Sequence, residues 1–121
     1  MLRRNNMLTL NNLRAFGADV DDGMNRCMNN EELFLRLVNM AAEEPNYTIL
    51  KESLAAGDLK TAFEAAHSLK GFLGNLGLTP LYDAAVELTE LLRNPIGDVD
   101  YDLPLAKLTK LYDEFTAMCK T

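Results

Sequence analysis

Apolar residues recur along most of the chain with the spacing of α-helices, and no stretch shows the alternation of a half-buried strand. Three clear apolar stripes occur within 30–41, 79–93 and 103–119. Their members are Leu33, Phe34, Leu37, Val38 and Ala41; Leu81, Ala84, Ala85, Leu88, Leu91 and Leu92; and Leu105, Leu108, Leu111, Tyr112, Phe115 and Met118. The pattern predicts an all-α protein.

Polar caps, glycines and prolines indicate where the helices begin and end. Side chains that can accept a hydrogen bond from the first helical turn occur at Thr9, at Asp19 or Asp21, and at Asn30, Asp58 and Thr79. Stops or interruptions follow at Gly17, about Met28, Pro45, Gly57, Gly77 and the loop 94–98. After Pro45 the helical pattern resumes at Tyr47, and the last helix is expected from about Leu103 to Cys119.

Four substantial amphipathic segments joined by short loops imply an antiparallel up-down-up-down four-helix bundle. We place this bundle in residues 30–119 and short N-terminal helices in 9–29, and we expect residues 1–8 to be flexible. The 121 residues suit a single domain with one modest core. A monomer is the default expectation for such a bundle.

Composition narrows the classes of partner and compartment. The net charge of -6 and the lack of a basic stripe disfavour nucleic acid as the main ligand. No apolar run is long enough to span a bilayer, and no apolar region follows Arg3 and Arg4 to make a signal peptide. Cys27 and Cys119 lack metal-ligand or redox spacing, which favours a reduced, cytoplasmic protein, although a disulfide between them stays open.

His67 is the only histidine, and a helical wheel places it on the polar face of its helix. The opposite half of the wheel carries the apolar residues Ala62, Ala65, Leu69, Phe72, Leu73 and Leu76. Around His67 lie Lys60, Gly71 and Gly74, within roughly 40°, and Glu64 and Lys70, at roughly 60° on opposite sides. A buried structural histidine is therefore disfavoured, and an incidental surface histidine would leave the glycines unexplained.

The two glycines beside His67 weaken the helix, since each glycine in a helix interior costs about 1 kcal/mol relative to alanine. We interpret Gly71 and Gly74 as an open strip that lets another molecule approach the imidazole; close helix packing is the alternative, disfavoured because both face away from the core. Lys70 can pair with phosphoryl oxygens on the ring or can be an ordinary surface lysine. Phe63 lies about 40° from His67 on the wheel and is either a contact for a docking partner or partly buried against a neighbouring helix.

The stretch AHSLKGFLGNLGL resembles the signature of histidine-containing phosphotransfer (HPt) domains, with His67, Lys70, Gly71 and Gly77 at the family's spacing. The resemblance covers about residues 10–118. It implies that a receiver-domain aspartate, or a hybrid sensor histidine kinase, passes a phosphoryl group to Nε2 of His67, which passes it to a response regulator. It further implies that Lys70 holds the phosphoryl oxygens, that Gly71 leaves room for them, and that Mg²⁺ belongs to the receiver, with no cofactor or metal on this chain.

Other functions remain to be weighed against this phosphocarrier. An enzyme that uses His67 as general base needs an orienting acid and a nucleophile in a pocket, and Ser68, the next residue on the helix, does not face the ring. An interaction bundle without phosphotransfer typically lacks the histidine. The phosphoacceptor domain of a chemotaxis-type kinase would need kinase segments that are not seen in this sequence.

Overall fold

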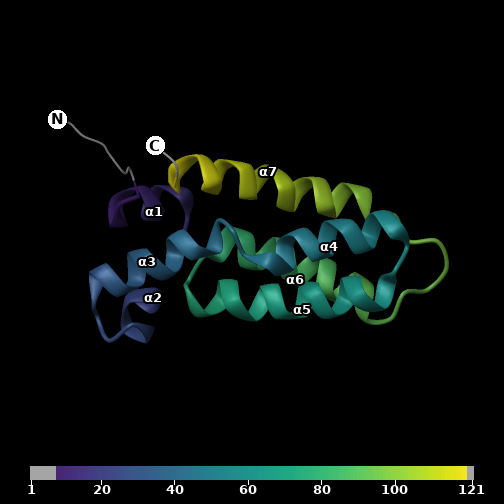
Figure 1. Cartoon of the computed structure of the whole chain (residues 1–121), viewed down its shortest axis with the longest axis horizontal. Coiled ribbons are helices and arrows are strands. Elements are labelled where there is room, and N and C mark those ends of the chain that lie inside the picture. The colour runs from purple at the N-terminus through teal and green to yellow at the C-terminus, as the bar shows by residue number, and fades with distance from the viewer. Residues whose placement is uncertain (1–7, 120–121) are drawn as a thin grey trace.

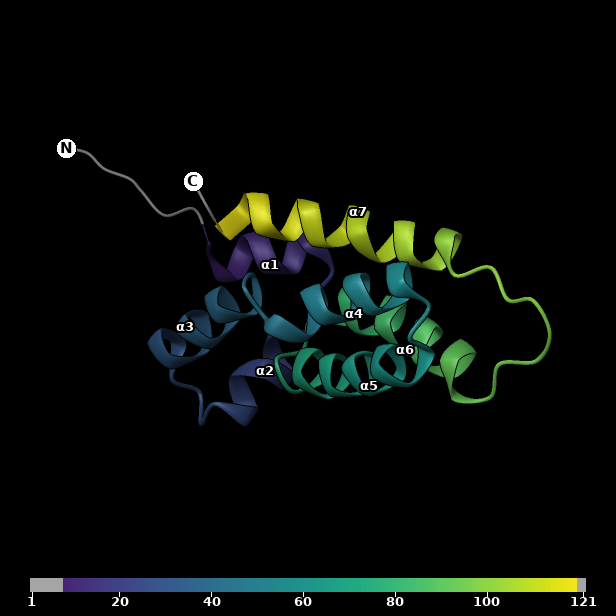
Figure 2. The ribbon, with the colours of Figure 1, turned by 45° about the vertical axis from the view of Figure 1, so that its right-hand side comes forward.

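The computed structural model describes residues 8–119, and within this range the chain forms seven helices and no strand. The helices are α1 (Leu10–Phe16), α2 (Val20–Arg26), α3 (Glu31–Ala41), α4 (Pro45–Ala56), α5 (Leu59–Asn75), α6 (Thr79–Arg93) and α7 (Asp102–Cys119). Helices α4 to α7 run along the long axis of the molecule, and α1, α2 and α3 gather at one end (Figures 1 and 2). The predicted all-α class is confirmed.

Four of the predicted helix starts carry the expected cap, a side-chain oxygen that accepts a hydrogen bond from the backbone N–H three residues later. These caps are Thr9, Asp19, Asn30 and Asp58. Asp58 begins α5, the helix of His67, and accepts both the backbone N–H of Thr61 at 3.2 Å and its hydroxyl at 2.7 Å. The hydroxyl and backbone bonds from Thr61 lower the pKa of the Asp58 carboxyl. The start of α5 is thus set by chemistry local to the sequence.

Two predicted helix starts are wrong. Helix α6 begins one residue earlier than expected, with Leu78 at the cap position and no side-chain cap; the Thr79 hydroxyl donates instead to the Gly77 carbonyl at 3.3 Å. The helical pattern is interrupted between α3 and α4, and Pro45 is the first residue of α4. Helix α4 therefore starts two residues before Tyr47, the predicted start. A proline suits that position because the first-turn N–H groups have no partner within the helix.

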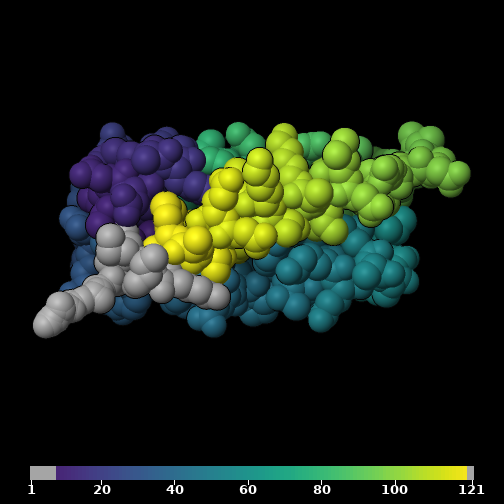
Figure 3. All heavy atoms as spheres, turned by 90° about the horizontal axis from the view of Figure 1, so that it is seen from above, coloured from purple at the N-terminus to yellow at the C-terminus, as the bar shows by residue number. Residues whose placement is uncertain are grey.

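Helix α5 makes extensive contacts with both α4 and α6, the largest between any helices of the molecule. The short connections at Gly57-Asp58 and at 76–78 turn the chain back on itself, so these neighbours pack along their lengths. Helix α7 lies along the outside of the molecule in Figure 3 and closes the core. The largest fully buried side chains come from six of the seven helices and include Leu13, Phe34, Leu50, Leu69, Leu73, Leu81, Leu88, Leu108, Tyr112 and Phe115.

The N-terminal segment joins this same core. Leu8, Leu13 and Val20 are all buried. Of the segment 1–8 that we expect to be flexible, the structure describes only Leu8, whose side chain is 4% exposed; residues 1–7 lie outside the described part of the chain. Burial of this apolar side chain next to α1 adds to the stability of the core.

Helix α7 secures the break between α3 and α4. The Tyr112 hydroxyl donates a 2.8 Å hydrogen bond to the carbonyl of Ala41, the last residue of α3. The Tyr112 ring also stacks on that of Tyr47, with 3.9 Å between centroids and 6° between planes. Burial raises the pKa of the Tyr112 phenol.

Cys27 and Cys119 are both free thiols, so the disulfide left open by the sequence is not formed.

Candidate functional site

The His67 side chain is exposed near the middle of α5, as the helical wheel predicted. Five of the six residues assigned to the opposite face are buried: Ala62, Ala65, Leu69, Leu73 and Leu76. The sixth, Phe72, is only partly buried, and Ala66, which the wheel did not assign to the core, is fully buried. The imidazole therefore projects from a helix whose other side is held firmly in the core.

The only described side chain in ring contact with His67 is Phe63, one turn earlier on α5. The two ring centroids are 6.0 Å apart and the planes differ by 22°. Within residues 8–119, neither imidazole nitrogen makes a hydrogen bond, and no carboxylate lies within ion-pair distance of the ring. A histidine that acts as general base usually has an orienting partner of this kind. A ring nitrogen of His67 is instead free to act as a nucleophile.

Lys70 and Gly71 lie on the face of α5 next to His67. The Lys70 side chain is half-buried, and among the described residues no carboxylate forms an ion pair with it. Gly71 is exposed, and a Cβ added there would have no neighbouring atom within 4 Å. Gly71 thus leaves an open surface, as expected, and the Lys70 ammonium is free to bind an anion that arrives there.

Gly74 has a different role from the one the sequence suggested. A Cβ added to Gly74 would lie 3.0 Å from the Tyr82 ring of α6, which is closer than almost all real contacts of this kind. Gly74 therefore permits close packing between α5 and α6, the alternative that its outward position had disfavoured. The open strip beside His67 is correspondingly limited to Gly71.

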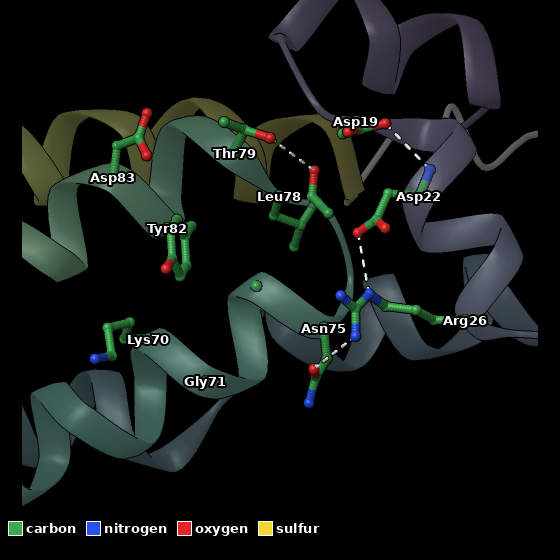
Figure 4. Close-up of a pocket in the computed structure, with 12 residues that line it drawn as sticks. Asp19, Asp22, Arg26, Lys70, Gly71, Asn75, Leu78, Thr79, Tyr82 and Asp83 are labelled. Atoms are coloured by element: carbon green, nitrogen blue, oxygen red, sulfur yellow. Dashed lines mark hydrogen bonds and ion pairs between the residues drawn. The ribbon is translucent and has the colours of Figure 1, made fainter.

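A cleft of about 460 Å³ opens beside Lys70, between α2, α5 and α6 (Figure 4). Helix α6 contributes Tyr82 and Asp83 to its lining, and α2 contributes Asp22 and Arg26. Arg26 is already engaged, since it donates to Asp22 at 3.0 Å and to Asn75 at 3.5 Å. Sequence reasoning missed these residues because no local pattern shows that α2 and α6 lie next to Lys70.

Arg93, the last residue of α6, lies beside Phe63. The Arg93 guanidinium carbon is 5.3 Å from the centroid of the Phe63 ring, and Arg93 is paired with Glu90 at 3.1 Å. Phe63 is partly buried and packs against the core, as one of its two interpretations held. Lys60 and Glu64, the other two residues assigned to the histidine face, are exposed on α5.

The described residues restrict other kinds of site. No group of three or more histidine, cysteine, aspartate or glutamate residues among them could hold a metal ion. None of the helices described here combines the length and the apolar character that a membrane span requires.

Taken together, the fold and site define an all-helical protein with one exposed histidine, flanked by a free lysine and an open glycine. The family model described as "Hpt domain" matches residues 27–118, about three quarters of the chain. The chain therefore belongs to the Hpt domain family, whose members carry phosphoryl groups on histidine in two-component signalling and interact with receiver and kinase domains. The match begins at Cys27, whereas the sequence resemblance extended back to about residue 10. No curated protein and no solved structure matches the chain.

Proposed function

We propose that this chain is a histidine phosphocarrier, with His67 as the residue that is phosphorylated. A receiver-domain aspartate, or a hybrid sensor histidine kinase, supplies the phosphoryl group, and a response regulator takes it. The observation that carries the proposal is the state of His67: it is the only histidine of an Hpt chain, it is exposed, and its nitrogens lack partners among residues 8–119.

In the proposed step, the lone pair of a His67 ring nitrogen attacks the phosphorus of the receiver's aspartyl phosphate. The N–P bond forms as the P–O bond to the aspartate breaks, and the electron pair of that bond leaves with the carboxylate. The ring becomes positively charged, and its other nitrogen can release a proton to water because the side chain is exposed. Transfer to the next receiver reverses these bonds.

Lys70 and Gly71 have supporting roles in this proposal. The Lys70 ammonium lies one turn along the helix from His67 and holds the phosphoryl oxygens through charge-assisted hydrogen bonds. Gly71 leaves the space in which the phosphoryl group and the docked receiver fit, consistent with the open surface at its Cα. Any Mg²⁺ in the reaction is assigned to the receiver.

The docking face we propose lies on α5 around His67. It comprises the exposed residues Lys60, Glu64 and Gly71 and the partly buried residues Phe63 and Gly74. It is carried by α4–α7 as an up-down-up-down four-helix bundle. We further propose that the chain acts as a cytoplasmic monomer. The family and the exposure of His67 support the proposed docking face, which would lie under a receiver positioned over the middle of α5.

The test is phosphotransfer from a receiver that its kinase has loaded with radioactive phosphate. The wild-type chain should gain an acid-labile label, and His67→Gln should gain none while its circular dichroism spectrum stays helical. Absence of label on a folded wild-type chain, with several receivers, would contradict the proposal. The remaining reading would then be an interaction module that binds receivers through the same face.

A further inference from the structure

A series of side-chain contacts connects α6 to His67. The Glu90 carboxylate accepts hydrogen bonds from Nε and Nη2 of Arg93, at 3.3 and 3.1 Å. The Arg93 guanidinium lies 5.3 Å from the centroid of Phe63, and the Phe63 ring lies 6.0 Å from that of His67. The contacts thus run from α6 to Phe63 of α5, and from Phe63 to the imidazole.

An exposed imidazole that lacks a hydrogen-bond partner would ordinarily rotate among its side-chain rotamers. In enzymes that use histidine, a hydrogen bond to the second ring nitrogen usually fixes the orientation of the ring. Here, within the described residues, Phe63 is the side chain whose ring lies next to that of His67. Phe63 can serve this purpose because residues four apart on a helix are neighbours on its surface.

Phe63 itself is held from the neighbouring helix. A guanidinium near an aromatic ring is attracted by the ring quadrupole, and this attraction favours an ordered ring over a mobile one. The two hydrogen bonds from Arg93 to Glu90 fix the plane of the guanidinium. The C-terminal turn of α6 therefore contacts the side chain that lies next to the imidazole.

We propose that Phe63 is a positioning residue for phosphoryl transfer on His67, and that Arg93, oriented by Glu90, keeps Phe63 in place. The inference rests on the proposed function and adds a mechanism to it. A ring held in one orientation presents one nitrogen to the donor, whereas a rotating ring presents both. Phosphorylation of the wild-type chain is accordingly confined to a single ring nitrogen.

The experiment must separate positioning of the imidazole from docking of a receiver. Phosphoramidate is a suitable donor because it is too small to need a docking face: its N–P bond breaks, ammonia leaves, and the phosphoryl group forms a bond with the imidazole. The wild-type chain is compared with Phe63→Leu, which keeps apolar volume but lacks the ring, with Phe63→Tyr, which keeps the ring, and with Arg93→Gln. Nitrogen-15 NMR identifies the nitrogen that is modified.

Phe63→Leu should react about two- to tenfold more slowly with phosphoramidate, the range that an aromatic pair contributes, and should be modified on both nitrogens. Phe63→Tyr should restore the single site, and Arg93→Gln should give an intermediate result. In the unphosphorylated chain, the ring-current shift of the His67 protons should disappear in Phe63→Leu. This shift reports the contact independently of any phosphorylation.

Two outcomes would overturn the inference: one concerns the positioning role of Phe63 alone, and the other concerns the proposed function as a whole. If Phe63→Leu reacts with phosphoramidate at the wild-type rate and nitrogen but loses transfer from a receiver, Phe63 is a docking residue and the positioning role is wrong. If neither phosphoramidate nor any receiver labels the wild-type chain, the proposed function fails and the inference fails with it.

Discussion

The backbone N–H of Asp19 donates a 2.7 Å hydrogen bond to the carbonyl oxygen of Gly77. This bond connects the cap of α2 to the turn that follows α5, and Gly77 has a positive φ of 70° there. A Cβ on Gly77 would overlap the Asp19 carbonyl oxygen, so the close approach requires glycine. The glycine ten residues after the histidine thus sets where α2 docks, and with it one wall of the cleft beside Lys70.

Replacement of Gly77 by alanine should destabilise the protein by about 1–3 kcal/mol, since it adds a steric overlap to an unfavourable backbone conformation. Urea unfolding measures this loss. Gly57→Ala is the matched control, because Gly57 has a φ of 76° but open space around its Cα. If both variants lose the same free energy of unfolding, the overlap with Asp19 adds nothing to the cost of the positive φ.

Gly71→Leu should block transfer from a receiver while raising the free energy of unfolding by up to about 1 kcal/mol, because a Cβ at this position meets no neighbouring atom and leucine favours the helix more than glycine does. Phosphotransfer and urea unfolding are measured on the same sample. Gly74→Ala serves as the comparison: its Cβ meets the Tyr82 ring, so its gain in helix propensity should be offset. Undiminished transfer to Gly71→Leu would mean that no partner approaches α5 there.

Lys70→Ala should slow phosphotransfer by about ten- to a hundredfold, since a charge-assisted hydrogen bond contributes about 1.5–3 kcal/mol. Rapid-quench sampling of the radioactive transfer gives the rate. Lys110→Ala, an exposed lysine of α7 away from the site, is the control for the loss of one positive charge. A rate for Lys70→Ala equal to that of this control would make Lys70 an ordinary surface residue.

The thiol of Cys119 should react slowly with iodoacetamide at neutral pH, because burial raises its pKa to about 11. Only the thiolate reacts, and at pH 8 about one thiol in a thousand is ionised at such a pKa. The alkylation rate of Cys119 in a Cys27→Ser background should therefore climb about tenfold per pH unit up to pH 10. A plateau near pH 9, as for a free cysteine, would show that Cys119 is not shielded.

Tyr112→Phe should lower the free energy of unfolding by about 1–2 kcal/mol, because it removes the hydroxyl that hydrogen-bonds to the buried Ala41 carbonyl and leaves the rest of the ring in place. Thermal unfolding followed by circular dichroism measures the change. Tyr82→Phe is the control for a tyrosine hydroxyl at an exposed position. A loss no larger than that of the control would mean that water replaces the missing bond.

The sequence predicted what depends on neighbouring residues and missed what depends on distant ones. The caps at Asn30 and Asp58 were correct because each is a contact across three residues. The outward position of His67 was correct because helical periodicity alone fixes it. The packing of Gly74 against Tyr82 was not foreseen, since it depends on how closely α5 and α6 approach.

The same distinction applies to the surroundings of the histidine. The helical wheel brought Phe63 near His67, but it could not show Arg93, thirty residues further on, over the Phe63 ring. The burial of Leu8 was not foreseen for a related reason, because the core that Leu8 joins is built from residues far away in the sequence. Contacts of this kind become visible only when the helices are placed in space.

The hydrogen bond from Tyr112 to Ala41 also has a consequence for the nascent chain. Ribosomes make Ala41 seventy-one residues before Tyr112, so α3, α4, α5 and α6 all emerge while the Ala41 carbonyl lacks its closest partner. The Tyr47 ring likewise has no ring to stack on until the last helix is made. The segment around Pro45 can therefore gain these two contacts only after Tyr112 of α7 has been synthesised.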